Sequence, residues 1–244
     1  MSDEQARERE RRWVASGSED DEAALLAERV RLGELELRSL QLAAACVWPA
    51  ARRALAELGE EVEPTLLEPE ALAELWWFPE CGPAAWGRVV LALLGTVEEE
   101  LLQISDAWEP CGYCHEEEDR PDMEAFWVGL RQVVQAGEAP SGANFQIEAS
   151  EISHGLSEGG RLYPASRALY NGCRLLDECV DNLGREPWAW ELDPGDAYEL
   201  LLGRLRRGGT SEAELEAGLR RVGAWALGYG DFLDSAGAAL RDRV

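Results

Sequence analysis

The segment GPAAWGRVVLALLGTVEEELLQISDAW, residues 82–108, decides the fold that the sequence predicts. Pro83 stands where proline suits the first turn of a helix, and apolar side chains follow it at helical spacing. Between Val89 and Leu94 the segment is apolar almost all round, and a helix of this kind must be covered by other elements. We therefore expect a long central helix with further helices packed around it.

Helices are also predicted on both sides of this segment. Ser18 precedes EDDEAALLAERVRLG, which has acids in its first turn and Gly33 at its end, and Pro49 opens a helix that stops at Gly59. Alternation typical of strands is weak and confined to NFQIEASEI, residues 144–152. The fold class that we predict is an all-α bundle of roughly eight to ten helices with a helical-repeat-like N-terminal unit.

The same patterns suggest how the chain is divided. Residues 1–17 are strongly charged and are expected to form a disordered lead-in. Residues 18–136 would form an N-terminal helical half, and residues 164–244 a C-terminal helical half. Between them, residues 137–163 are rich in Gly and Ser and lack a clear period, which predicts a loop or a boundary.

The net charge of the chain limits the classes of molecule that it can bind. The chain has 244 residues, and 48 acidic residues against 23 basic ones give a net charge of −25. All of the basic residues are arginine. So negative a surface repels phosphate backbones, which argues against nucleic-acid binding. No apolar run is long enough to span a membrane and no apolar signal core is present, so we expect a cytoplasmic protein with reduced cysteines.

The negative charge is concentrated in residues 54–119, which hold seventeen acidic residues and the single basic residue Arg88. Such a block can simply be a set of solvated helix faces. Its aromatic residues suggest instead a docking face for a basic protein, because interfaces combine aromatic anchors with charge complementarity. The residues predicted to bind this partner are Glu68, Glu70, Glu74, Trp76, Trp77 and Glu80. The function that we predict from this block is a non-enzymatic acidic binding protein for a basic protein.

A zinc site is the alternative hypothesis. The stretch CGYCHEEED, residues 111–119, offers Cys111, Cys114 and His115, and thiolates and imidazoles are the ligands that zinc prefers. Only one such cluster is present, so these cysteines can equally be small side chains at a helix junction. The stretch also matches a c-type haem attachment pattern, but that attachment belongs to exported proteins. We therefore predict no cofactor, with zinc as the alternative.

A magnesium-dependent enzyme is the remaining alternative. Asp177 and Asp181 stand four residues apart, and therefore on one face of the helix predicted for residues 164–184. Such sites need a second acidic cluster facing the first, and no convincing one is found in the sequence. No nucleophile motif surrounds any serine, and the chain has only two histidines, so nothing identifies a catalytic residue.

One segment suggests a family. Residues 21–55, DEAALLAERVRLGELELRSLQLAAACVWPAARRAL, resemble the N-terminal helical unit of uncharacterised proteins of myxobacterial type, some of which are named putative immunity proteins. EEEDRP, residues 116–121, is similar to a turn in some of those chains. The resemblance covers about a seventh of the chain. It implies a helical fold and a binding role, and it carries over no catalytic residue. Together with the acidic block, it leads us to predict an immunity or antitoxin-like inhibitor of a basic protein.

Overall fold

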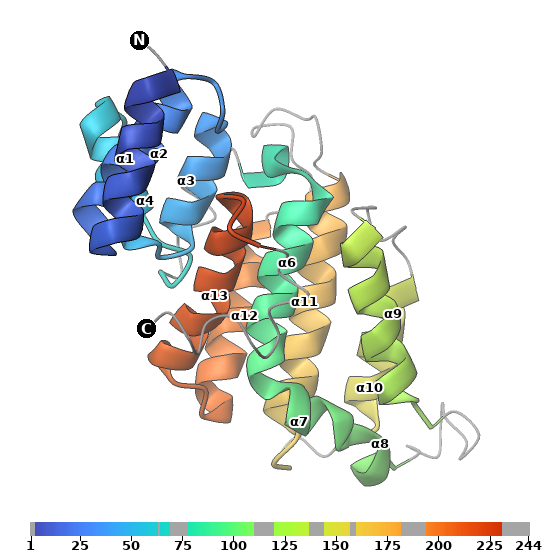
Figure 1. The fold of residues 1–244 in the computed structure, drawn as a ribbon. Coiled ribbons are helices and arrows are strands. Elements are labelled where there is room, and N and C mark those ends of the chain that lie inside the picture. The colour runs from blue at the N-terminus through green and yellow to red at the C-terminus, as the bar shows by residue number, and fades with distance from the viewer. Residues whose placement is uncertain are drawn as a thin grey trace. The chain divides into compact units, whose positions relative to one another are not determined.

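The computed structural model confirms the all-helical fold class: the residues that it describes form helices and turns, and none of them forms a strand (Figure 1). The described residues are 3–62, 64–68, 78–109, 120–136, 144–156, 160–181 and 194–230. Within these ranges the side chains of residues 3–6, 79, 80, 144, 178–181 and 194 are not described. The chain divides into two compact units, the first formed by residues up to Glu68 together with those from Leu219 on, the second by Pro69–Gly218.

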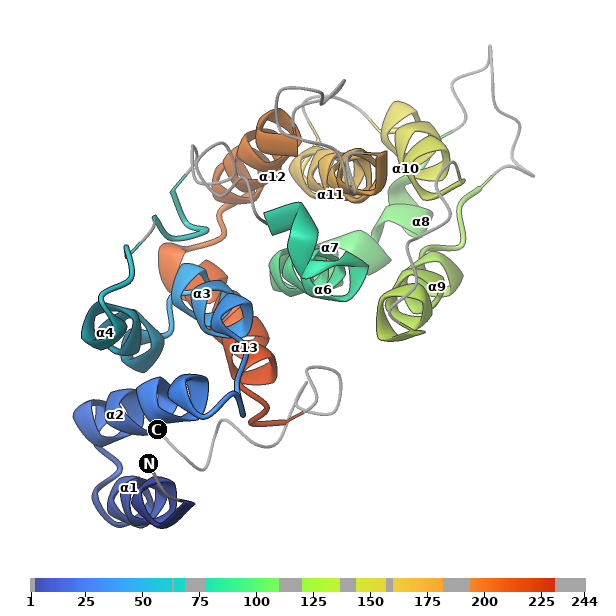
Figure 2. The same ribbon diagram turned by 90° about the horizontal axis from the view of Figure 1, so that it is seen from above.

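The first unit contains α1 (Asp3–Ser16), α2 (Glu19–Arg31), α3 (Leu37–Ala45) and α4 (Pro49–Leu58), together with the end of α13 (Glu212–Ala226). Helix α2 lies against both α1 and α4, and α3 packs on α4 (Figures 1 and 2). Alanines supply much of the core, which lets the helices approach closely. The fully buried core residues include Leu26, Leu40, Ala43, Ala51, Ala54, Leu55 and Leu227.

Helix ends follow the capping pattern of the sequence. Ser18 Oγ accepts a 3.2 Å hydrogen bond from the backbone NH of Asp21 at the start of α2. At the end of α4, Gly59 adopts a left-handed conformation with a φ of 77°. Ser211 and Glu214 form a reciprocal capping box at the start of α13, with bonds of 2.8 Å from Ser211 NH and 3.3 Å from Glu214 NH.

The second unit is built around α6 (Pro83–Leu94), in which every residue from Ala85 to Leu94 is buried. Helix α6 lies against α9 (Met123–Ala136) and α11 (Tyr163–Asp181) (Figure 2). Arg88 crosses to α9 by donating a 3.4 Å hydrogen bond to the carbonyl of Val134. The prediction of a central helix is therefore confirmed for this part of residues 82–108.

The predicted helix is nevertheless shorter than expected. It ends at Leu94 and is followed by the 3₁₀ turn η2 (Gly95–Val97), α7 (Glu98–Leu102) and α8 (Ile104–Ala107). Glycine has low helix propensity, and Thr96 Oγ1 donates a 2.7 Å hydrogen bond to the carbonyl of Leu93. This side chain competes with the backbone for a carbonyl at the helix end, and the chain changes direction there.

Two further segments differ from their sequence expectations. Residues 3–16, expected to be disordered, form α1, because Arg9 NH1 donates a 2.7 Å hydrogen bond to the carbonyl of Ala24 and Trp13 stacks on Tyr229. Residues 144–154, expected to be a loop with weak strand character, form α10 (Asn144–His154). Residues 137–163 are also not the division that the structure shows, because the two units separate near Glu68 and Gly218.

The remaining elements of the second unit are the 3₁₀ turn η1 (Phe78–Cys81), α12 (Pro194–Gly208) and the beginning of α13. Helix α11 packs against both α10 and α12. No helix in the part of the chain that the structure describes is long and apolar enough to cross a membrane.

Candidate functional site

Most of the predicted site residues lie outside the described part of the chain. This is true of Cys111, Cys114 and His115, and of Glu70, Glu74, Trp76 and Trp77. Glu80 belongs to η1, although its side chain is not described. Glu68 is exposed, and its Oε1 accepts hydrogen bonds of 2.9 and 3.1 Å from the backbone NH and the hydroxyl of Thr65. These two hypothetical sites therefore stay predictions.

The other predicted acidic pair is at the end of α11. Asp177 is half-buried, whereas the side chain of Asp181 is outside the described residues. Burial raises the pKa of the nearby Cys173 thiol, and the charges of Asp177 and Glu148 raise it further, so this cysteine stays protonated. Among the described residues no group of three or more His, Cys, Asp or Glu side chains is arranged to hold a metal ion.

The described residues contain a different candidate site, a hollow of about 420 Å³ between the start of α9 and one face of α10. Its walls combine aromatic and aliphatic side chains with three carboxylates. The lining residues are Trp108, Pro121, Asp122, Ala125, Phe126, Phe145, Glu148, Glu151 and Ile152. We call this feature the α9–α10 hollow, and all of it lies in the second unit.

The α9 side of the hollow is held by hydrogen bonds at the helix start. Asp122 Oδ1 accepts a 2.9 Å bond from the backbone NH of Ala125 and so caps α9. Ser105 of α8 donates a 2.8 Å bond to the carbonyl of Pro121 and accepts one of 3.2 Å from the NH of Met123. These bonds fix the position of Asp122, one of the residues that line the hollow.

The α10 side is set by helical spacing. Phe145, Glu148 and Ile152 stand at positions i, i+3 and i+7, so they share one face of α10. Phe145 meets Phe126 of α9 edge to face, with ring centroids 5.4 Å apart and an interplanar angle of 87°. This aromatic contact joins the two helices at the hollow.

The most buried aromatic side chain in the lining is that of Trp108, which is only 2% exposed. Glycine at position 155 makes room for it, because a Cβ there would stand 1.8 Å from Trp108 Nε1. The neighbouring backbone is tied as well, since the NH of Glu109 donates a 3.0 Å hydrogen bond to the carbonyl of Gly155. The aromatic floor of the hollow is therefore fixed in place by the segment that follows α10.

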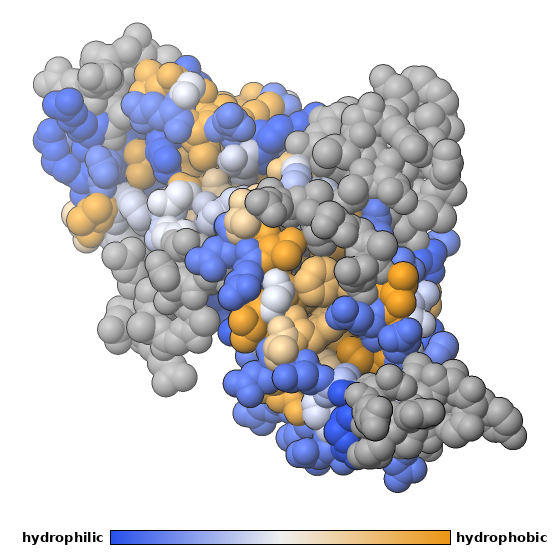
Figure 3. Space-filling view, turned by 90° about the vertical axis from the view of Figure 1, so that its right-hand side faces the viewer, coloured by the Kyte–Doolittle hydropathy of each residue, from blue (hydrophilic) through white to orange (hydrophobic). Residues whose placement is uncertain are grey.

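The lining of the hollow combines acidic side chains with aromatic ones. Within the part of the chain that the structure describes, no arginine forms an ion pair with Asp122, Glu148 or Glu151. Phe126 and Phe145 offer apolar contact and aromatic faces beside these carboxylates. The side of the protein on which α9 and α10 lie shows apolar residues bordered by hydrophilic ones (Figure 3), and the exposed apolar side chains include Val128 and Ile147.

The sequence contained the pattern for half of this site. Phe145, Glu148 and Ile152 already have helical spacing, but the Gly and Ser residues around them favoured the loop interpretation. Asp122 and Trp108 come from segments that local periodicity does not connect with residues 144–152.

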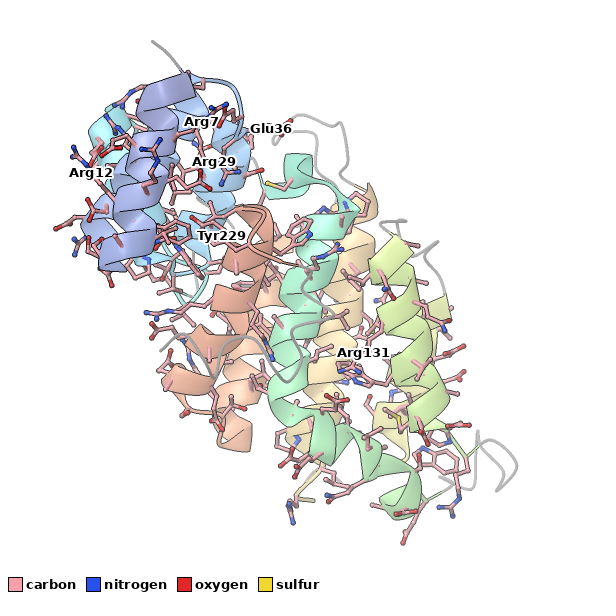
Figure 4. All side chains as sticks on the ribbon, in the orientation of Figure 1. Arg7, Arg12, Arg29, Glu36, Arg131 and Tyr229 are labelled. Carbon is pink, nitrogen blue, oxygen red and sulfur yellow. The ribbon has the colours of Figure 1, made fainter. Side chains whose placement is uncertain are left out.

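A second polar cluster lies inside the first unit. Glu22 Oε1 accepts a 2.9 Å hydrogen bond from Trp48 Nε1, and the Trp48 ring meets Tyr229 at a centroid distance of 5.9 Å. Tyr229 follows the end of α13, and Arg29 NH1 donates a 3.2 Å hydrogen bond to the carbonyl of Leu227 in the same segment (Figure 4). Glu22 is buried and the other three side chains are half-buried, and their contacts join α2, α4 and the segment after α13, so we assign the cluster to folding rather than to ligand binding.

Comparison with known proteins found no relative: no family model, no curated protein and no solved structure matches the chain.

Proposed function

We propose that this chain is a non-enzymatic binding protein for a basic protein, an immunity or antitoxin-like inhibitor, and that the α9–α10 hollow is a docking point for the partner. The observation that carries the proposal is the combination of Asp122, Glu148 and Glu151 with aromatic walls, without an arginine of the described chain paired to them. A pocket with apolar walls and a few convergent polar groups is what recognition sites commonly provide.

The net charge of −25 supports the same conclusion. Long-range attraction accelerates encounter with a cationic partner, whereas the apolar contacts in the hollow would slow its dissociation. The acidic segment that contains Glu68, Trp76 and Trp77 would contribute to the same encounter. Charge alone would give only weak, salt-sensitive association, so the hollow is the part of the proposal that predicts specificity.

The experiment has two steps. The full chain, immobilised, first captures its partner from the cells that produce it, and the captured protein is identified, expressed and purified. Binding is then measured by calorimetry for the wild type, for the E148Q/E151Q variant and for the E99Q/E199Q variant. The last is a matched control, because Glu99 and Glu199 are exposed, belong to the same unit and do not line the hollow.

We expect a basic partner whose affinity falls about tenfold or more for E148Q/E151Q, about 1.4 kcal/mol, and less than threefold for the control. An inhibitor should also suppress the partner's activity at equimolar concentration. An acidic partner, or equal losses in the two variants, would contradict docking at the hollow.

A further inference from the structure

We infer that the α9–α10 hollow receives one arginine side chain of the partner, with the guanidinium held by the carboxylates and the aliphatic stem against the phenylalanine rings. This inference rests on the proposed function and names the chemical group that the site recognises. A site of this kind would bind arginine more tightly than lysine, whereas attraction by net charge alone would not distinguish between the two.

Size is the first argument. A volume of about 420 Å³ is near the lower end of the range of roughly 300 to 1,000 Å³ found for small-ligand pockets. A space of this kind admits a single long side chain rather than a helix or a strand. The occupant is therefore one extended group presented by the partner's surface.

The arrangement of the walls is the second argument. Glu148 and Glu151 line the hollow from α10, and Asp122 lines it from the start of α9, so a cation inside would be flanked by acidic residues from two elements. A guanidinium presents donors in a fixed planar fork and can bond several carboxylate oxygens at once. Its flat, weakly hydrated surface also stacks on aromatic rings such as those of Phe126 and Phe145.

The protein supplies an internal example of the same recognition. Arg131 donates a 3.1 Å hydrogen bond to Glu98 Oε2, and its guanidinium carbon lies 5.3 Å from the ring centroid of Trp127. Arg131 extends from α9 in Figure 4. A carboxylate and an aromatic ring thus hold a guanidinium on the very helix that forms one wall of the hollow.

The test uses blocked pentapeptides, Gly-Gly-X-Gly-Gly, in which X is arginine, lysine, citrulline or norleucine. Each is titrated into the full chain, and the dissociation constant is followed by NMR shifts of the protein amides. We expect a single site of millimolar affinity for the arginine peptide, at least fivefold weaker binding of the lysine peptide and no measurable binding of the other two. The shifted amides should belong to α9 and α10.

The variants make the test specific. E148Q/E151Q should weaken the arginine peptide about tenfold, E99Q/E199Q less than twofold, and Phe145→Ala at least threefold. A thermal melt of each variant checks that it folds. Equal affinity for arginine and lysine, or equal losses in the matched charge variants, would overturn the inference.

Failure of this inference differs from failure of the proposed function. If the captured partner binds the hollow but the arginine peptide neither binds nor competes with it, the inference is wrong and the proposed function stands. If the arginine peptide binds as expected but no basic partner is captured, the recognised group is correct and the proposed function is wrong.

Discussion

The indole nitrogen of Trp48 donates a 2.9 Å hydrogen bond to Oε1 of Glu22, which is only 9% exposed. The two residues belong to the start of α4 and to α2, and the ring of Tyr229 packs beside the indole. Burial raises the pKa of the Glu22 carboxyl above its ordinary value of 4.5, although the bond from Trp48 lowers it in part. The first unit therefore contains a carboxylate whose charge it accommodates poorly.

Replacing Glu22 with Gln should stabilise the protein at neutral pH. The glutamine oxygen still accepts the bond from Trp48, while the cost of burying a charge disappears. In the wild type the folded state binds the Glu22 proton more tightly than the unfolded chain does. The stability that Glu22 contributes is therefore present below pH 4.5, and it is lost as pH rises through the pKa that Glu22 has in the folded state.

Denaturant unfolding at several pH values measures this effect. The free energy of unfolding of E22Q minus that of the wild type should increase as pH rises from about 4.5 and then level off. Trp48→Phe is the control. It removes the hydrogen bond that lowers the pKa of Glu22, so the pH range in which the stability changes should move to higher pH. A difference that is independent of pH would show that the Glu22 carboxyl is not the titrating group.

Gly155→Ala should destabilise the protein and disturb the hollow. The new Cβ would overlap Trp108, whose Nε1, Cδ1 and Cε2 atoms would all lie within 2.4 Å of it. We expect a loss of about 1 to 3 kcal/mol in the free energy of unfolding, the usual cost of overpacking a core. The matched control is Gly129→Ala, where the nearest side-chain atom is 3.9 Å away and alanine improves helix propensity. If G155A proved as stable as G129A, Trp108 could not be packed as described.

Gly218→Ala tests the close approach of α13 to α6. A Cβ at this position would stand 2.8 Å from the carbonyl oxygen of Ala92, a backbone atom that has little freedom to move. The clash should exceed the gain in helix propensity and lower the free energy of unfolding by about 1 to 3 kcal/mol. Gly203→Ala, which meets only the flexible end of Arg207 at 3.5 Å, should be neutral or stabilising. Urea titration of both variants decides between these outcomes.

Chelation separates the binding hypothesis from the zinc hypothesis. If Cys111, Cys114 and His115 hold zinc, native mass spectrometry should show an excess of one metal ion that a chelator removes and that C111S lacks. The proposed function predicts that affinity for the basic partner is the same before and after chelation. A partner that binds only the metal-loaded chain would contradict that prediction.

Much of the fold follows from local patterns in the sequence. The apolar run from Val89 to Leu94 predicts the buried helix α6, and Ser18 and Ser211 predict helix starts that the structure contains. The end of α6 at Gly95 was not predicted, because the apolar spacing continues beyond it. The low helix propensity of Gly95 and the Thr96 hydroxyl bond end the helix there, and neither changes the apolar spacing.

The candidate site was less accessible to prediction. Trp108, Asp122 and Glu148 come from three segments, and tertiary contacts such as that of Phe126 with Phe145 and that of Trp108 with Gly155 bring them together. The sequence does show that the chain is rich in carboxylates. It does not indicate which carboxylates lie beside aromatic rings, because that depends on contacts between residues far apart in the chain.

The placement of Leu227 in the core of the first unit has a consequence for biosynthesis. A ribosome that has made α2, α3 and α4 must still translate residues 69–218 before Leu227 emerges. At about 5 to 20 residues per second, this delay is on the order of ten to thirty seconds. During that time the apolar surfaces that later cover Leu227 remain exposed on the nascent chain. The first unit can therefore complete its core only after the second unit has been synthesised, although its helices are the first to be made.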